Sequence, residues 1–341
     1  MPASEFDLIA AINERLPASG RRVRVPSGDD AAVVEAGSVS AVSVDAVVDG
    51  VHFTLPAFGP EAVGRKAFAA ALSDLAAMGA DPGEVYVVVC APAEMEDDQL
   101  LRIADGLAAV AAREDVSIAG GDLVASPVLV VSVTAVGYEP AGAGLLTRSG
   151  ARPGEVVALT GELGGAAAAL ALLGLGEGVA DSPAVGEGLS PRVREALTAR
   201  QLDPRPRLRE GRALAAAGAT AMIDISDGLG ADAGHVAAAS ECRLEIDLDR
   251  VPVSEGVAEL TGGEGAALEL AASGGEDYEL LATLPSAALE PAREAVARAG
   301  TVLTEIGYAV EGRGVALRLP GGGEIEPVGF DQRRGSRSGS G

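Results

Sequence analysis

The chain alternates between strand-like and helix-like patterns along most of its 341 residues. Short runs rich in Val, Ile and Leu alternate with longer Ala- and Leu-rich stretches in which apolar residues recur three and four apart. This order predicts an α/β (α+β) fold. The Gly- and Pro-rich segment 138–155 separates two strand-like runs and indicates a domain boundary. We therefore predict an N-terminal domain over 1–143, a C-terminal domain over 144–330 and a flexible tail over 331–341.

The charge of the chain narrows the classes of partner. Asp and Glu number 50 and Lys and Arg 26, so the net charge is −24. Binding to nucleic acid or to an anionic membrane needs a basic surface, so neither is expected. The excess of acids has two interpretations, either solubility in a salty cytoplasm or carboxylates that hold divalent cations.

Cysteine usage and the N-terminal segment bear on the compartment. Cys90 and Cys242 are the only cysteines, which gives no disulfide framework and no zinc-site spacing. The first 16 residues read as an amphipathic helix with acids rather than a signal peptide. No apolar stretch reaches the roughly 20 residues that span a bilayer. A cytoplasmic protein is therefore expected.

Several common catalytic devices are missing from the sequence. There is no GxxxxGK[ST] phosphate loop, Lys66 is the only lysine, and His52 and His235 are the only histidines. No G-x-S-x-G motif accompanies them, so a catalytic triad is not indicated. Any chemistry must rest mainly on carboxylates.

The stretch MIDISDGLGADAGH (222–235) contains the most informative carboxylates. Asp224 and Asp227, with Ser226 between them, lie where a strand gives way to a helix. They are interpreted either as helix caps or as magnesium ligands beside a phosphate. The same stretch matches the G-x-G-x-x-A dinucleotide pattern, but two carboxylates would repel a bare pyrophosphate there.

Other acids occur in similar surroundings. Asp29 and Asp30 lie in a predicted turn in SGDDAAVV, Asp45 lies in SVDAVVDGVHF, and Asp122 follows a Gly pair in AGGDLVAS. Asp74 lies on a predicted helix of small apolar residues, so partial burial and a polar partner are expected. Glu276, in SGGEDYEL, belongs either to a β-turn or to a site that binds a polar or cationic substrate group. Several acidic loops flanked by Gly predict a multi-metal phosphate site.

These motifs together resemble the thiamine-monophosphate kinase family, which is related to aminoimidazole ribonucleotide synthetase and selenophosphate synthetase. The resemblance covers roughly residues 5–330, and it rests on GDDAAVV, VDAVVDGVHF, LSDLAAMGADP, GGD, LTRSGA, IDISDGL and SGGEDYEL. LSDLAAMGADP and SGGEDYEL together are the most specific of them.

The resemblance implies transfer of the γ-phosphate of ATP to thiamine monophosphate, giving thiamine diphosphate, by direct in-line transfer with several Mg²⁺ ions and no phosphoenzyme. It implies metal ligands at Asp30, Ser43, Val44, Asp45, Asp74, Asp122, Asp224 and Asp227, of which Asp30, Asp45, Asp122 and Asp227 are the catalytic candidates. It also implies nucleotide contacts at Gly121, Asp122, Arg148 and Ser226, and substrate contacts at His52, Glu276 and Phe330. A homodimer whose N-terminal sheets pair is implied as well.

Two positions depart from the family pattern. Val44 stands where the family often has Thr, which leaves only a backbone oxygen as a ligand. Phe330 stands where Tyr is common, which keeps ring stacking and removes the hydroxyl. Three alternatives remain open at this level: a sister ATP-using enzyme, a non-catalytic nucleotide sensor, and an acidic structural protein whose Asp residues are caps. His52 either contacts the substrate or orders its own loop.

Overall fold

A computed structural model describes residues 5–16, 22–25, 32–37, 39–142, 144–175, 186, 188–331 and 336–339. The chain divides into two compact units. The first comprises Met1–Leu75, Ala80–Pro140 and Leu202–Pro204, and the second Ala76–Gly79, Ala141–Gln201 and Arg205–Gly341. Each unit combines helices with a mixed sheet, so the predicted α/β class is confirmed.

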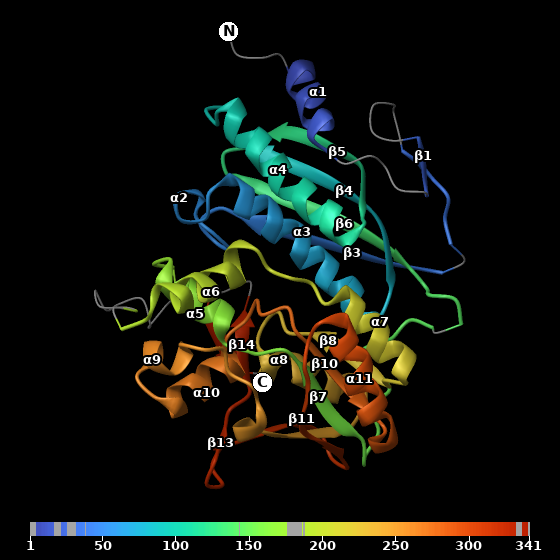
Figure 1. The fold of residues 1–341 in the computed structure, drawn as a ribbon, viewed down its shortest axis with the longest axis vertical. Coiled ribbons are helices and arrows are strands. Elements are labelled where there is room, and N and C mark those ends of the chain that lie inside the picture. The colour runs from blue at the N-terminus through green and yellow to red at the C-terminus, as the bar shows by residue number, and fades with distance from the viewer. Residues whose placement is uncertain are drawn as a thin grey trace. The chain divides into compact units, whose positions relative to one another are not determined.

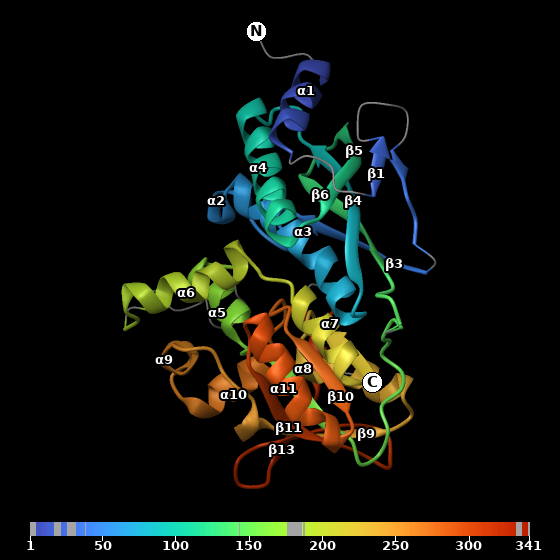
Figure 2. The same cartoon turned by 45° about the vertical axis from the view of Figure 1, so that its right-hand side comes forward.

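The first unit is built on a four-stranded sheet with helices against one face (Figures 1 and 2). Its elements are α1 (Glu5–Arg15), β1 (Val23–Val25), β2 (Val33–Val34), β3 (Ser40–Val48), α2 (Leu55–Phe58), α3 (Pro60–Ala77), β4 (Asp81–Ala91), α4 (Asp97–Glu114), β5 (Ser117–Ala125) and β6 (Val130–Tyr138). The strand order is β3-β6-β4-β5, so β3 and β5 are the two edges. Only the β4–β5 pair of this sheet is parallel.

More buried and more exposed residues alternate along the strands of this sheet, so one of its faces is buried and the other is exposed. Val131, Val133 and Ala135 of β6 are fully buried, and α4 packs on that side. The other face carries exposed valines, among them Val44 and Val88. A half-buried antiparallel strand shows this period of two because successive side chains point to opposite faces.

The second unit contains a seven-stranded sheet of order β13-β12-β9-β11-β7-β10-β8. Its elements are β7 (Val156–Thr160), α5 (Gly165–Leu172), α6 (Pro191–Leu202), α7 (Leu208–Ala217), β8 (Ala221–Asp224), α8 (Leu229–Ala239), β9 (Arg243–Asp247), η1 (Leu248–Arg250), α9 (Val257–Thr261), α10 (Glu264–Ser273), β10 (Leu280–Leu284), η2 (Ser286–Ala288), α11 (Leu289–Ala299), β11 (Leu303–Val310), β12 (Gly314–Arg318), β13 (Glu324–Ile325), β14 (Val328–Asp331) and β15 (Ser336–Gly339). The last two form a separate antiparallel pair.

The sheet of the second unit is covered on both faces. Every residue of β7, β8 and β10 is buried, which explains why these strands read as continuous apolar runs rather than as alternating ones. Helices α8 and α10 pack on one face, where Leu229 and Val236 join the core. Helices α7 and α11 pack together on the other (Figures 1 and 2).

No helix in the described ranges is long and apolar enough to cross a bilayer.

Candidate functional site

The predicted site residues of the first unit fall into two groups on its sheet. Ser43 and Asp45 lie on β3, and because residues two apart share a face, both point to the buried side. Asp74 on α3 is half-buried, as expected, and it accepts a hydrogen bond from the Ser43 hydroxyl. The structure therefore brings together two of the predicted metal ligands, with Asp45 two positions along the same strand.

Asp122 lies apart from this group. Register pairs Asp45 with Val133, Val133 with Val87, and Val87 with Gly121, so Asp45 and Gly121 occupy one row on opposite edges of the sheet. Three inter-strand spacings of about 4.8 Å separate them by roughly 14 Å. Asp122, the next residue, points to the opposite, exposed face. Asp45 and Asp122 of one chain therefore cannot hold the same ion.

The predicted loop around Asp122 is wrong: the residue lies inside β5, a strand that the glycine pair does not interrupt. A Cβ on Gly121 would lie 2.1 Å from the carbonyl oxygen of Val87, so close strand contact requires glycine here. The carboxylate of Asp122 accepts the N–H of Leu123 at 2.9 Å.

His52 orders the turn after β3. Its Nδ1 accepts the N–H of Val48 at 3.0 Å, and its own backbone N–H donates to the carbonyl oxygen of Val48 at 3.0 Å. The bond to Nδ1 supports the loop-ordering interpretation. A substrate contact through Nε2 stays a prediction. Val44 is 67% exposed on the face opposite Asp45.

Asp30 lies outside the described residues. Phe330 lies in β14, but its side chain is outside the described part of the chain. Its neighbour Gly329 lies close to Asp227, since a Cβ there would be 3.0 Å from the Asp227 carbonyl oxygen. The backbone of Phe330 is therefore next to the loop that carries Asp227.

In the second unit, Asp224, Ser226 and Asp227 occupy the predicted junction between β8 and α8. Asp224 is buried, and Ser226 and Asp227 are half-buried. The N-cap of α8 is Gly228, and it makes no side-chain capping bond. Asp224 and Asp227 are therefore not the caps of this helix.

The role of Asp232 was not predicted from the sequence. Its Oδ2 accepts the backbone N–H groups of Ser226 (3.0 Å), Asp227 (3.1 Å) and Gly228 (3.0 Å). These are the N–H groups that a dinucleotide pattern would offer to a pyrophosphate, so the structure argues against that interpretation. Burial, together with the charges of Asp224 and Asp227, raises the pKa of Asp232.

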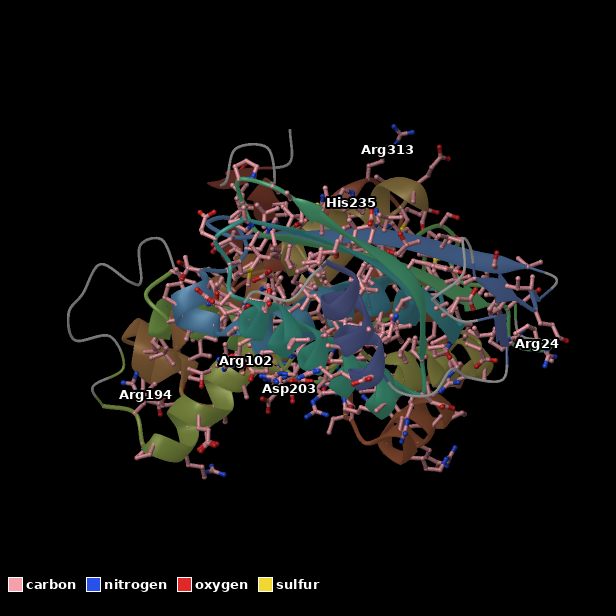
Figure 3. All side chains as sticks on the ribbon, turned by 90° about the horizontal axis from the view of Figure 1, so that it is seen from above. Arg24, Arg102, Arg194, Asp203, His235 and Arg313 are labelled. Carbon is pink, nitrogen blue, oxygen red and sulfur yellow. The ribbon has the colours of Figure 1, made fainter. Side chains whose placement is uncertain are left out.

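This concentration of carboxylates suits a hard cation. Asp227, Asp232 and His235 have ligand atoms within 4.8 Å of one another, and His235, labelled in Figure 3, is exposed. The nearby negative charges that disfavour ionisation of Asp232 would be offset by a divalent cation. Asp224 and Asp227 offer oxygen atoms, which Mg²⁺ prefers.

Glu276 lies in a strained turn beside this junction. Its φ is +67°, and its N–H donates to the carbonyl oxygen of Ser226 at 2.8 Å. The Nε2 of Gln201 donates to its carboxylate at 2.8 Å. Such a conformation in a non-glycine residue is typical of functional turns. The sequence motif located this turn, but it did not indicate Gln201.

The rest of SGGEDYEL is structural. Asp277 accepts the N–H groups of Gly164 (2.9 Å) and Ala166 (3.1 Å) at the start of α5, and burial raises its pKa to about 7. Glu279 is fully buried and pairs with Arg207. The segment that follows Glu276 is therefore fixed at two points, by Asp277 at the start of α5 and by Glu279 in a buried ion pair.

Arg148 is exposed, and its neighbour Thr147 accepts the N–H of Met222 at 3.0 Å. The Arg148 carbonyl accepts a hydrogen bond from the Ser240 hydroxyl at 3.1 Å. The backbone of Arg148 therefore runs beside β8, the strand that ends at Asp224.

Comparisons with known proteins agree on one family. The N-terminal domain model of the AIR synthase related proteins matches residues 28–138, and the C-terminal domain model matches residues 152–320. Thiamine-monophosphate kinase of Salmonella typhimurium is 38% identical over 309 residues, which is 90% of each chain. That of Mycobacterium tuberculosis is 41% identical over 284 residues, which is 80% of this chain and 79% of the relative.

Solved structures give the same result. The crystal structure of thiamine-monophosphate kinase from Stenotrophomonas maltophilia has a TM-score of 0.80 and 35% identity, and covers 93% of this chain and 97% of that one. AaThiL complexed with AMPPCP and TMP has a TM-score of 0.74 and 31% identity, with 95% and 96% covered. By fold, motifs and identity, the chain belongs to the thiamine-monophosphate kinase family of AIR synthase related proteins.

Proposed function

We propose that this chain transfers the γ-phosphate of ATP to the phosphate of thiamine monophosphate and so forms thiamine diphosphate. The observation that carries the proposal is its similarity, over 95% of its length, to a structure that holds AMPPCP and TMP together. The curated relatives named thiamine-monophosphate kinase support the same activity. The sister-enzyme and sensor alternatives are not favoured.

The residues fit a reaction between two anions. Phosphoryl transfer depends mostly on positioning and on neutralisation of charge. Magnesium ions, when bound, supply that neutralisation. In the first unit Ser43, Asp45 and Asp74 are the proposed ligands, with Asp122 and the carbonyl of Val44. Asp30, outside the described residues, completes that set by resemblance.

In the second unit Asp224 and Asp227 are the proposed metal ligands, and Ser226 and Arg148 the proposed nucleotide contacts. Gly121 and Asp122 have the corresponding nucleotide role in the first unit. A guanidinium such as that of Arg148 offers a fixed fork of donors to phosphate oxygens. His52, Glu276 and Phe330 are the proposed contacts for the thiamine moiety.

The reaction needs no strong general base. A phosphate monoester has its second pKa near 6, so the attacking oxygen is largely ionised at neutral pH. This agrees with a chain that has two histidines and one lysine. We propose direct in-line transfer without a phosphoenzyme. The proposed location is the cytoplasm, where free thiols such as Cys90 and Cys242 persist.

A direct assay tests the activity. Purified protein with Mg²⁺, ATP and thiamine monophosphate is expected to give thiamine diphosphate and ADP in equal amounts, followed by chromatography. Neither product should form with free thiamine or without Mg²⁺, because the acceptor is a phosphate and the carboxylates require cations. Binding of ATP without any thiamine diphosphate would reject the proposal in favour of a sister enzyme or a sensor.

We also propose a homodimer in which two copies share each site. The face of the first sheet opposite α4 exposes Val42 (60%), Val44 (67%), Val88 (37%) and Val124 (43%), a set of large apolar side chains that a second sheet could cover. If two such sheets face one another about a two-fold axis parallel to the strands, edge β3 of one copy lies over edge β5 of its partner. The side chain of Asp122 points to the shared face and that of Asp45 to the other face, so Asp45 and the partner's Asp122 would contribute to one site around the edge of β3.

Mixed dimers test this sharing. A heterodimer of Asp45→Asn and Asp122→Asn chains, isolated with two different tags, is expected to keep about half of the wild-type activity, because one of its two sites is intact. Each variant homodimer should be inactive. A heterodimer of wild type with the Asp45→Asn/Asp122→Asn double variant is the matched control, and it should be nearly inactive. The reverse pattern would place each site within one chain.

A further inference from the structure

One buried carboxylate holds the loop that carries the proposed ligand Asp227. Asp232, on the first turn of α8, is 2% exposed. Its single oxygen Oδ2 accepts three consecutive backbone N–H groups, those of Ser226, Asp227 and Gly228, at 3.0–3.1 Å. Three bonds to one carboxylate oxygen fix the path of the backbone through residues 226–228.

The same loop holds the turn that contains Glu276. The carbonyl oxygen of Ser226 accepts the N–H of Glu276 at 2.8 Å, and that of Ile225 accepts the N–H of Tyr278 at 2.9 Å. The approach is close, since a Cβ on Gly275 would lie 2.3 Å from the oxygen of Ser226. A shift of the 226–228 loop therefore moves the backbone of Glu276 as well.

We propose that Asp232 is a positioning residue, which orients the 226–228 loop and, through Ser226, the turn at Glu276, without itself contacting metal or substrate. The roles of Asp227, Ser226 and Glu276 rest on the proposed function. The hydrogen bonds of Asp232 to the backbone do not depend on the proposed function. The positioning role and the proposed function can therefore be tested separately.

A rival explanation makes Asp232 a metal ligand together with Asp227 and His235, whose ligand atoms lie within 4.8 Å of one another. Three N–H donors already surround Oδ2, which leaves this oxygen little capacity for a cation. His235 is exposed on α8 (Figure 3), whereas Asp232 is buried. The substitution His235→Gln removes the imidazole and therefore separates the two explanations.

The test uses Asp232→Ala, Asp232→Asn and His235→Gln in the full-length protein, with two readouts. The first is hydrogen exchange of the amides of Ser226, Asp227 and Gly228 without Mg²⁺ or nucleotide. The second is kcat/KM as a function of Mg²⁺ concentration. Asp232→Ala should speed exchange at these amides and lower kcat/KM by about 10- to 100-fold, the usual loss for a residue that orients ligands.

An asparagine keeps an oxygen that can accept the N–H groups, so Asp232→Asn is expected to stay within about threefold of wild type in both readouts. His235→Gln should match wild type. The proposal would be overturned if Asp232→Asn lost more than tenfold in kcat/KM while the amides of Ser226, Asp227 and Gly228 stayed protected. That result would show that Asp232 acts through its charge, as a metal ligand does. An equal loss in His235→Gln would overturn it as well. Unchanged exchange in Asp232→Ala would do the same. If Asp232→Ala does not fold, the Asp232→Asn outcomes decide.

Discussion

Replacing Asp227 with Asn is expected to lower kcat/KM for ATP and thiamine monophosphate by at least about 100-fold while the fold stays intact. Asp227 is half-buried in the loop before α8, and the N-cap position of that helix is Gly228. The substitution removes one negative charge and one anionic ligand and keeps the shape, so it weakens a magnesium site without opening a cavity. Part of the loss should be recovered at high Mg²⁺ concentration.

The matched control is Asp249→Asn, which makes the same change of charge at an exposed residue of η1 in the same unit. It should leave both kcat/KM and its dependence on Mg²⁺ unchanged. Thermal melting of both variants checks the fold. Normal activity of Asp227→Asn at low Mg²⁺ would remove Asp227 from the metal site.

The substitution Arg207→Met is expected to lower the free energy of unfolding by about 3–5 kcal/mol. Glu279 is completely buried, and Arg207 bonds both of its oxygens, with Nε at 2.7 Å and Nη2 at 2.5 Å. Thr160 donates a further bond at 2.7 Å. Among the described residues, loss of the guanidinium leaves Arg200, at 3.5 Å, as the remaining cation paired with this buried carboxylate, and this is the source of the large effect. Urea denaturation measures it.

The double variant Arg207→Met/Glu279→Met separates the charge from the packing. Removal of both ions is expected to restore most of the stability, because an apolar pair of similar volume has no desolvation cost. The exposed pair Arg192–Glu255 is the control, and Arg192→Met should change stability little because solvent screens that pair. A double variant as unstable as Arg207→Met would show that packing by Arg207, and not its charge, stabilises this region.

The local sequence pattern was sufficient to predict many of the helices and strands. The recurrence of apolar residues at three and four positions predicts helices over 61–78 and 98–113, and α3 and α4 match these ranges within one residue at each end, because this recurrence is a property of the segment itself. Strand β5 was not predicted because two glycines interrupt its apolar run. The glycine at 121 is required by the close approach of the neighbouring strand β4, which the local sequence does not show. Helix α10 was also not predicted, since its Ala-rich, nearly uniform apolar sequence has little amphipathic contrast.

The sequence by itself determined which residue types could do chemistry: carboxylates at a strand–helix junction, a half-buried Asp74 that needs a partner, and few bases. The tertiary structure alone decided their partners. Glu279 meets Arg207 across 72 residues of chain, and Gln201 meets Glu276 across 75. Periodicity depends on neighbours two to four positions away, whereas an ion pair or a shared sheet row depends on how distant segments pack. For the same reason only the strand order shows that Asp45 and Asp122 lie on opposite edges of one sheet.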